Sequence, residues 1–180
     1  FGMSFQISPF SFFQTNTHGA HILYGIIRDL VAAISPQLTF DLYCGTGTIG
    51  MLLTPFSDHV IGIEESLSAT QDATINAAKN TLSNITFITN RVKNVLKTTV
   101  TPPDLAIVDP PRSGMVPKAL HRLLSCYPRH IIYVSCNSTA LMADLQKIIS
   151  HGYTLDSIQS IDLFPHTPHL ETVVALQLTP

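Results

Sequence analysis

Three side chains that can act in nucleophilic or acid–base chemistry stand where predicted strands end or begin. Cys136 follows the apolar run 131–134, and Asp109 follows the apolar residues 105–108 and precedes two prolines. Glu171 stands at the mouth of the last predicted strand. A thiolate is a strong nucleophile and a carboxylate can accept a proton. Because ligands of open α/β sheets bind just outside strand ends, these residues can supply a nucleophile, a rigidly held carboxylate and a base.

Each of the three residues also has an explanation that involves no chemistry. A lone cysteine is usually buried for packing, and the prolines after Asp109 can simply form a stiff turn. A glutamate at the start of a strand can be solvated. His166 and His169 could join Glu171 as metal ligands, but two prolines keep this segment extended. We therefore expect no metal site.

A glycine-rich turn lies between a predicted strand and a predicted helix. Gly45, Gly47 and Gly50 satisfy the spacing GxGxxG, and Glu64 lies nineteen residues beyond Gly45. Glycine lets the backbone turn tightly and approach a ligand, and the helix that follows offers free N–H groups. The same spacing is the dinucleotide fingerprint, so the turn alone does not separate NAD from S-adenosylmethionine.

Two polar residues near this turn, Asp41 and Glu64, favour S-adenosylmethionine, and Asn90 is a third candidate for the cofactor. Asp41 precedes the first glycine by four residues, where a carboxylate can order the loop and face the ammonium group of methionine. Glu64 ends the second strand and can accept hydrogen bonds from both ribose hydroxyls, although the neighbouring Glu65 could do so instead. Asn90 ends the third strand, where the edge of adenine would lie. Each of the three also has a plain structural alternative.

Strands and helices alternate along most of the chain, which is typical of a doubly wound parallel sheet. The last two strands have no helix between them, so we expect them to form an antiparallel edge. The predicted strands are 38–43, 59–64, 85–89, 105–109, 130–135, 154–163 and 172–178. The predicted helices are one capped by Asn16 or Thr17 and closed by Pro36, and those at 48–53, 66–80, 92–96, 117–126 and 139–150. Residues 5–14, rich in phenylalanine, are expected to form an ordered loop.

The composition fits one domain, residues 1–180, with a substantial core, because 45% of the residues are hydrophobic. A formal net charge of −2 gives no basic footprint for nucleic acid. Three cysteines, Cys44, Cys126 and Cys136, form no zinc-finger pattern and suit a reducing cytosol. No apolar run reaches the roughly 20 residues of a membrane span. Since the chain does not begin with methionine, we expect a processed or excised fragment.

Six short motifs, in one order, cover nearly the whole chain. Together they resemble the S-adenosylmethionine-dependent uracil-5 RNA methyltransferases, which make 5-methyluridine in tRNA and ribosomal RNA. The motifs are Ser11-Phe-Phe-Gln14-Thr-Asn16, Asp41-Leu-Tyr-Cys-Gly-Thr-Gly47, Val60-Ile-Gly-Ile-Glu64, Val108-Asp-Pro-Pro-Arg-Ser-Gly114, Tyr133-Val-Ser-Cys-Asn137 and Phe164-Pro-His-Thr-Pro-His-Leu-Glu171. The resemblance implies a Rossmann-like methyltransferase sheet of seven strands.

The resemblance also assigns roles to residues. It implies that Cys136 is the nucleophile, Glu171 the base, and Asp109 both a catalytic and a cofactor-binding residue. The other residues it points to for S-adenosylmethionine are Gln14, Asp41, Tyr43, Gly45, Gly47, Thr48, Glu64 and Asn90. The His-Leu-Glu ending favours 23S ribosomal RNA over tRNA as the substrate.

The chain departs from the family pattern in several places. Thr48 stands where ribosomal-RNA members often have asparagine, Ser138 replaces a common proline, and Ala143 replaces an arginine, while Asp144 is retained. We expect the family's N-terminal RNA-binding barrel to lie outside this fragment, in agreement with the lack of a basic footprint. Two other functions stay open, an NAD-dependent oxidoreductase that uses the same glycine turn and a non-catalytic RNA-binding module.

Overall fold

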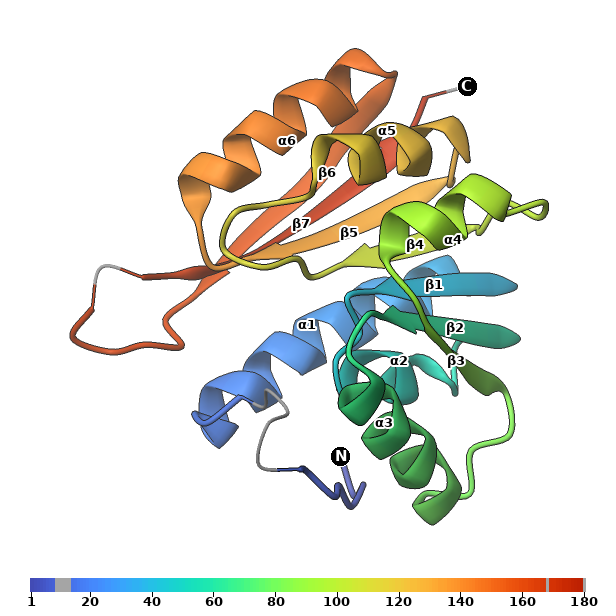
Figure 1. Cartoon of the computed structure of the whole chain (residues 1–180). Coiled ribbons are helices and arrows are strands. Elements are labelled where there is room, and N and C mark those ends of the chain that lie inside the picture. Colours follow the sequence, from blue (N-terminus) through green and yellow to red (C-terminus); the bar gives the residue numbers. More distant parts are fainter. Residues whose placement is uncertain (9–13, 168, 180) are drawn as a thin grey trace.

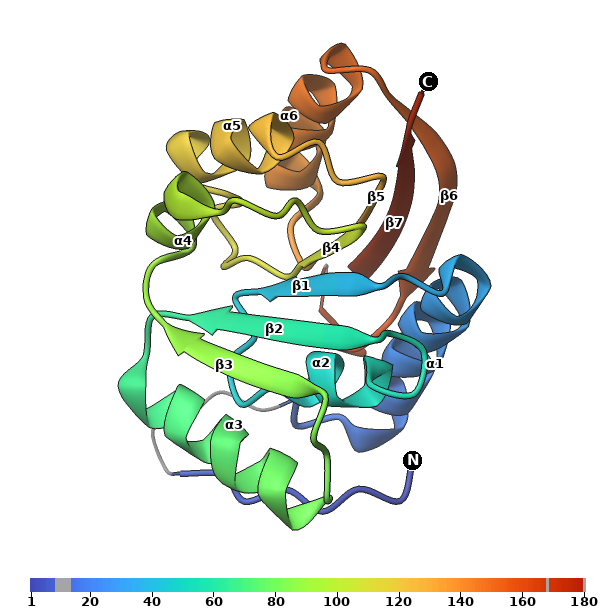
Figure 2. The ribbon, with the colours of Figure 1, turned by 90° about the vertical axis from the view of Figure 1, so that its right-hand side faces the viewer.

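The centre of the protein is one sheet of seven strands, which Figures 1 and 2 show in two views at right angles. The computed structural model describes residues 1–8, 14–167 and 169–179. The strands are β1 (Leu38–Leu42), β2 (His59–Glu64), β3 (Ile85–Thr89), β4 (Leu105–Val108), β5 (His130–Ser135), β6 (Tyr153–Ile161) and β7 (Glu171–Leu178). Their order is β3-β2-β1-β4-β5-β7-β6. The first five strands are parallel, and β7 is antiparallel to both β5 and β6, which confirms the predicted sheet.

Helices cover both faces of the sheet. They are α1 (Thr17–Ile34), α2 (Thr48–Leu53), α3 (Leu67–Lys79), α4 (Val92–Thr98), α5 (Pro117–Ser125) and α6 (Ser138–Ser150). Helices α4, α5 and α6 pack on one face, and α1, α2 and α3 pack on the other (Figures 1 and 2). Each face therefore has its own hydrophobic core.

The central strand β5 shows why the sequence gives a two-sided sheet. Ile131 and Tyr133 contribute to the core under α5 and α6, whereas Ile132 and Val134 contribute to the core under α1. All four side chains are buried. Because successive side chains of a strand point to opposite faces, a strand covered on both sides reads as an uninterrupted apolar run.

Several predicted boundaries were wrong by one or two residues: β4 ends at 108, β6 spans 153–161, β7 begins at 171, α4 ends at 98 and α5 ends at 125. Two further shifts of one residue have clear local reasons. Strand β1 ends at Leu42 rather than at Tyr43, because Tyr43 has a φ of 64°, outside the extended range. Helix α6 begins at Ser138 rather than at Thr139, because the side chain of Asn137 accepts hydrogen bonds from the first turn. Part of the predicted loop 5–14, namely residues 9–13, lies outside the described residues.

An extended segment at the start of the chain is bonded to α3. The backbone N–H groups of Ser4, Gln6 and Ser8 donate to side-chain oxygens of α3 and its C-cap: Asn80 at 3.0 Å, Asn76 at 2.6 Å and Asp72 at 2.8 Å, respectively. The two asparagines return a bond from their amide nitrogens to the carbonyls of Ser4 and Gln6. The spacing of the donors matches that of the acceptors, because two residues of an extended chain advance roughly as far as one turn of a helix.

The topology places ligands at one edge of the sheet. The strand order reverses between β1 and β4, so the loops after these two strands leave toward opposite faces and open a crevice between them. None of the helices in the described part of the chain combines the length and the apolar character that crossing a lipid bilayer requires.

Candidate active site

The three residues with predicted chemistry come together on adjacent strands. Asp109 follows β4, Cys136 follows β5, and Glu171 is the first residue of β7. Strand β5 pairs with β4 on one side and with β7 on the other. Since Ser135 pairs with Thr172, Cys136 and Glu171 are next in register. An antiparallel β7 thus brings its first residue to the edge where the parallel strands end.

Three carboxyl groups at this edge have pKa values near neutrality. Burial raises the pKa of Asp109 to about 7. Burial also raises the pKa of Asp41 to about 7; the Gly50 N–H bond opposes this shift, and the charge of Asp109 adds to it. Burial and then the charge of Asp109 raise the pKa of Glu171 to about 8. The cluster can therefore exchange protons near pH 7, and it favours a cationic ligand.

The Cys136 thiol is half-buried beside these carboxyls. Burial is the main cause that raises its pKa above the ordinary value, and the charge of Glu171 adds to it. The Arg112 guanidinium acts in the opposite direction and lowers the pKa of the thiol. At rest the sulfur is thus protonated, and it becomes a strong nucleophile only when its proton is removed.

A cavity lies at the crevice between β1 and β4. Six of the predicted cofactor residues line it: Gln14, Asp41, Tyr43, Gly45, Thr48 and Asp109. Asp41 orders the start of α2, because its Oδ2 atom accepts a hydrogen bond of 2.8 Å from the backbone of Gly50. Its Oδ1 atom is buried and has no hydrogen-bond partner among the described residues. A buried acceptor of this kind calls for a donor from a ligand.

Tyr24 is a cavity residue that sequence reasoning missed. Its ring lines the same cavity from α1, and burial followed by the charges of Asp109, Asp41 and Glu171 raises the pKa of its hydroxyl. The phenol therefore keeps its proton and can donate a hydrogen bond at neutral pH. In the sequence, Tyr24 stands beside the buried residues Leu23 and Ile27 of an amphipathic helix, so its spacing gave no signal of a site.

The remaining predicted cofactor residues shape the glycine turn. Gly47 caps α2 with a φ of 78°, and a Cβ atom there would lie 2.7 Å from the ring of Phe87. The Glu64 carboxylate accepts hydrogen bonds from the backbone of Gly45 at 3.2 Å and of Ser66 at 2.8 Å. The turn is thus held against the end of β2, and only glycine fits at position 47.

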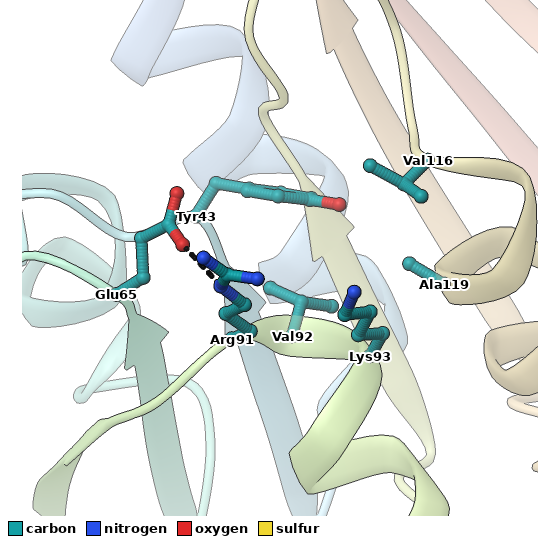
Figure 3. A pocket seen from close by; sticks show the side chains of 7 residues that line it. All are labelled: Tyr43, Glu65, Arg91, Val92, Lys93, Val116 and Ala119. Carbon is teal, nitrogen blue, oxygen red and sulfur yellow. Dashed lines mark hydrogen bonds and ion pairs between the residues drawn. The ribbon is translucent and has the colours of Figure 1, made fainter.

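A second cavity lies on the other side of Tyr43, as Figure 3 shows. Its apolar walls come from the Tyr43 ring and from Val92, Val116 and Ala119. Arg91, Glu65 and Lys93 bring charged groups to it, and Glu65 forms an ion pair of 3.1 Å with Arg91.

Asn90 acts on this second cavity indirectly. Its Oδ1 atom accepts hydrogen bonds from the Arg91 backbone at 2.8 Å and from the Asn94 side chain at 3.0 Å. These bonds hold the turn that carries Arg91. The sequence left Glu64 and Glu65 as alternatives, and their side chains lie in different places. Glu64 faces the glycine turn, and Glu65 faces the second cavity.

His169, near the last strand, contacts an arginine. His169 lies against Arg112, with ring nitrogens 3.1 and 3.2 Å from a guanidinium nitrogen. No group of three or more histidine, cysteine, aspartate or glutamate side chains within the described ranges could hold a metal ion. The three cysteines are free thiols.

A comparison with known families decides what the site belongs to. The family model described as tRNA (Uracil-5-)-methyltransferase matches residues 2–179. The chain belongs to this family. The similarity to uracil-5 RNA methyltransferases inferred from the six motifs is thereby confirmed.

Relatives of this uracil-5-methyltransferase family member are longer proteins. An "uncharacterized RNA methyltransferase" of Clostridium tetani is 45% identical over 176 residues, which are 98% of this chain and 39% of that protein. One from Caldanaerobacter subterraneus subsp. tengcongensis is 46% identical over 176 residues, again 98% and 39%. The chain thus spans about two fifths of the length of these curated relatives.

Solved structures agree with the family and with the fold. The tRNA (uracil-54, C5)-methyltransferase of Pyrococcus abyssi, in complex with S-adenosyl-L-homocysteine, is 34% identical, with a TM-score of 0.82 over 96% of this chain and 41% of that one. The N-methyltransferase NodS of Bradyrhizobium japonicum is 11% identical, with a TM-score of 0.74 over 91% of this chain and 98% of that one. The second likeness shows the fold alone.

The positions that depart from the family pattern are accommodated locally. Thr48 is the first residue of α2, and its hydroxyl lies 3.3 Å from that of Thr46. Ser138 is the first residue of α6 and follows a capping asparagine. Asp144 is buried and accepts hydrogen bonds from Tyr133 and from the backbone of Met115. The structure gives no reason for alanine at position 143.

Proposed function

We propose that this protein transfers a methyl group from S-adenosylmethionine to C5 of a uracil in RNA. The observation that carries the proposal is the meeting of Asp109, Cys136 and Glu171 on adjacent strands, beside a cavity lined by carboxyl groups. A thiol, a base and an adjoining cofactor cavity are the parts this reaction needs. An NAD-dependent oxidoreductase would give Cys136 and Glu171 no shared task.

The cavity suits the cationic end of S-adenosylmethionine, which would supply a methyl group on a sulfonium. Asp41 has an unsatisfied buried oxygen that can accept a hydrogen bond from the ammonium group, and Asp109 adds a second carboxyl. Gln14 and Thr48 add polar groups. Glu64 is placed to accept from the ribose hydroxyls once its bond to Gly45 is exchanged.

The second cavity suits the adenine ring. It is a slot between the aromatic ring of Tyr43 and the apolar side chains of Val92 and Ala119, with the Arg91 guanidinium at its rim (Figure 3). A planar heterocycle can stack on such surfaces. Tyr43 borders both cavities, so one elongated ligand can occupy both.

The three reacting residues then divide the chemistry. The Cys136 sulfur gives its proton to solvent and forms a bond to C6 of uracil, while the electron pair of the C5–C6 double bond moves onto the C4 carbonyl; the resulting enolate makes C5 nucleophilic. C5 forms a bond to the methyl carbon as the carbon–sulfur bond of the sulfonium breaks. Glu171 accepts the proton from C5, and the bond between C6 and Cys136 breaks. Asp109 stands on a rigid proline turn between the cofactor cavity and the thiol. We assign it the role of orienting the cofactor and the uracil relative to each other.

Binding of the cofactor is expected to release protons near pH 7. The pKa values of Asp41 and Asp109 are raised to about 7 in the free protein, and a cation beside them lowers both. Carboxyls that are partly protonated before binding therefore ionise on binding. The release should be largest somewhat below pH 7, between the pKa values of the free and the bound protein, and should disappear well above pH 8, where the free carboxyls are already ionised.

Calorimetry in two buffers that differ in their heat of ionisation measures this release. S-adenosylhomocysteine is the matched control, because it lacks the sulfonium charge and should release fewer protons. Equal heats in both buffers at pH 7 would contradict the shifted pKa values.

Methylation by the intact protein tests the proposed function. Unmodified 23S ribosomal RNA and tRNA are incubated with S-adenosylmethionine, and 5-methyluridine is mapped. We expect one product, in 23S ribosomal RNA from the sequence resemblance, with tRNA as the alternative outcome. Binding of NAD in place of S-adenosylhomocysteine would favour the oxidoreductase, and cofactor binding without turnover would favour a non-catalytic module.

We also propose that residues 1–180 form a single catalytic domain and that much of the RNA affinity resides in other parts of the full-length protein. The curated relatives extend well beyond the length matched by this chain. With a net charge of −2, the chain itself has little of the phosphate affinity that RNA binding requires. The RNA substrate would then be captured mainly by those other parts, and the target base would be unstacked to reach Cys136.

A further inference from the structure

Asn137, the residue after Cys136, forms hydrogen bonds in two directions. Its Oδ1 atom accepts from the backbone N–H groups of Thr139 at 3.0 Å and Ala140 at 3.4 Å, which caps α6. Its Nδ2 atom donates a bond of 2.8 Å to the carbonyl oxygen of Arg112. Exchanging the positions of Oδ1 and Nδ2 would lose all three bonds, so the hydrogen bonds fix the orientation of the amide group.

This side chain joins the two loops that carry reacting groups. One loop follows β5 and contains Cys136; the other follows β4 and runs from Asp109 to Arg112. The two strands are paired only as far as Val108 and Tyr133. Beyond that pair, the Asn137 side chain forms a hydrogen bond between the Cys136 loop and the Asp109 loop.

The far end of the Asp109 loop is anchored independently. Asp144 of α6 accepts a bond of 2.9 Å from the backbone of Met115 and one of 2.7 Å from the Tyr133 hydroxyl. A Cβ atom at Gly114 would lie 2.9 Å from the same carboxylate, so the backbone approaches it closely. Helix α6 therefore holds this loop twice, through Asn137 at its first turn and through Asp144 two turns later.

The placement of Arg112 also bears on the thiol. Among the groups that face the Cys136 sulfur, Glu171 and Asp109 oppose its ionisation and Arg112 favours it. The guanidinium is held by His169, on the segment that leads into Glu171. A loop that swings away from Asn137 would carry this positive charge away from the sulfur.

We propose that Asn137 is a positioning residue that holds the Cys136 thiol in line with the Asp109 loop. The inference rests on the proposed function and adds a residue to it. Ser138, the first residue of α6, has no ring to restrain its φ. The geometry of the Cys136 loop thus depends on the Asn137 side chain.

Two substitutions separate the cap from the bridge. Asn137→Asp and Asn137→Ser both keep an oxygen that caps α6, but neither can donate to the Arg112 carbonyl, because aspartate has no proton and serine is too short. We expect kcat for methyl transfer to fall by about 10- to 100-fold, the size of effect that small misplacements produce. KM for S-adenosylmethionine should change much less than kcat, because Asn137 itself does not line the cofactor cavity.

Asn84→Ser is the matched control. Asn84 is also half-buried, and its amide nitrogen bridges the carbonyls of Thr54 and Ser57 at the opposite edge of the sheet. All three variants should melt within about 4 °C of the parent, but only those at position 137 should lose turnover. Normal turnover in both Asn137 variants would overturn the proposal, as would an equal loss in Asn84→Ser.

A second readout does not depend on RNA. The rate at which iodoacetamide alkylates Cys136 in the folded protein is measured against pH by mass spectrometry of the peptide that contains Cys136, because Cys44 and Cys126 are also free thiols. If the bridge places Arg112 near the sulfur, Asn137→Ser, which adds no charge beside the thiol, should need a higher pH for the same rate, whereas Asn84→Ser should match the parent. An unchanged profile would contradict the bridge. A shifted profile in a protein that methylates no RNA would instead contradict the proposed function.

Discussion

Cys136→Ala is expected to lower methyl transfer to RNA by at least about 10⁴-fold, because it removes the sulfur that we propose adds to C6. Binding of S-adenosylhomocysteine should be unchanged, since Cys136 does not line the cofactor cavity. The most direct measurement uses RNA in which 5-fluorouridine replaces uridine. Fluorine at C5 leaves no proton for Glu171 to accept, so the parent protein should remain bonded to the RNA in denaturing gels.

Cys126→Ala is the matched control for this experiment. Cys126 is the C-cap of α5, near the end of the sheet away from the site, and like Cys136 it is a half-buried free thiol. Its variant should form the adduct as the parent does. An RNA adduct that survives Cys136→Ala would contradict the assigned nucleophile, and a parent protein that forms no adduct would contradict the covalent mechanism.

Glu171→Gln should slow turnover by about 10²- to 10⁴-fold, the range that a general base contributes. Glutamine has nearly the same shape but cannot accept a proton from C5. Because the Cys136 bond forms before this step, the methylated covalent adduct should accumulate in the variant. Quenched reactions analysed by mass spectrometry would show protein carrying RNA with one added methyl group.

The pH dependence of turnover gives a second test of Glu171. Its pKa is raised to about 8, so the carboxyl is mainly protonated below pH 8 and must ionise before it can act. Turnover should therefore rise with pH up to about 8, and Glu171→Gln should lose this part of the profile. Stability changes in the opposite direction. Because the folded protein holds this proton more tightly than the unfolded chain does, the free energy of unfolding falls as pH rises from the ordinary pKa of a glutamate toward about 8.

Asp156→Asn is a suitable control for Glu171→Gln. Asp156 is an exposed carboxyl on β6, the other strand of the same hairpin. Its amide variant should keep both the rate and the pH profile of the parent. If Glu171→Gln turned over normally and left no adduct, another group would have to remove the C5 proton.

Elements with strong local signals could be predicted from the sequence. Strands β2, β3 and β5 were predicted with their observed bounds, because runs rich in β-branched residues are interrupted by polar caps or turns. The antiparallel edge followed from the lack of a helix between the last two strands. Asp109, Cys136 and Glu171 could be brought to one edge because parallel strands end together and an antiparallel strand begins there.

Interactions between distant residues could not be predicted in the same way. Tyr24 lies within a helical apolar pattern, so its sequence position gives no hint of the carboxyl groups that surround it. Asn137 reads as a helix cap, and nothing in the sequence says that its other end meets a carbonyl 25 residues earlier. Such bonds depend on the direction in which loops leave the strands. The backbone angles of single residues such as Tyr43 determine this direction.

The segment at the start of the chain has a consequence for sequence divergence. Helix α3 binds the main chain at Ser4, Gln6 and Ser8 through the N–H groups of all three residues, and through the carbonyls of the first two. Main-chain groups are common to every residue type apart from the missing N–H of proline. Substitutions at these three positions therefore keep the main-chain bonds to the helix and lose only the side-chain bonds of Ser8 to Asp72 and of Gln6 to Lys79. Proline is the exception, since it would remove a donor from the ladder.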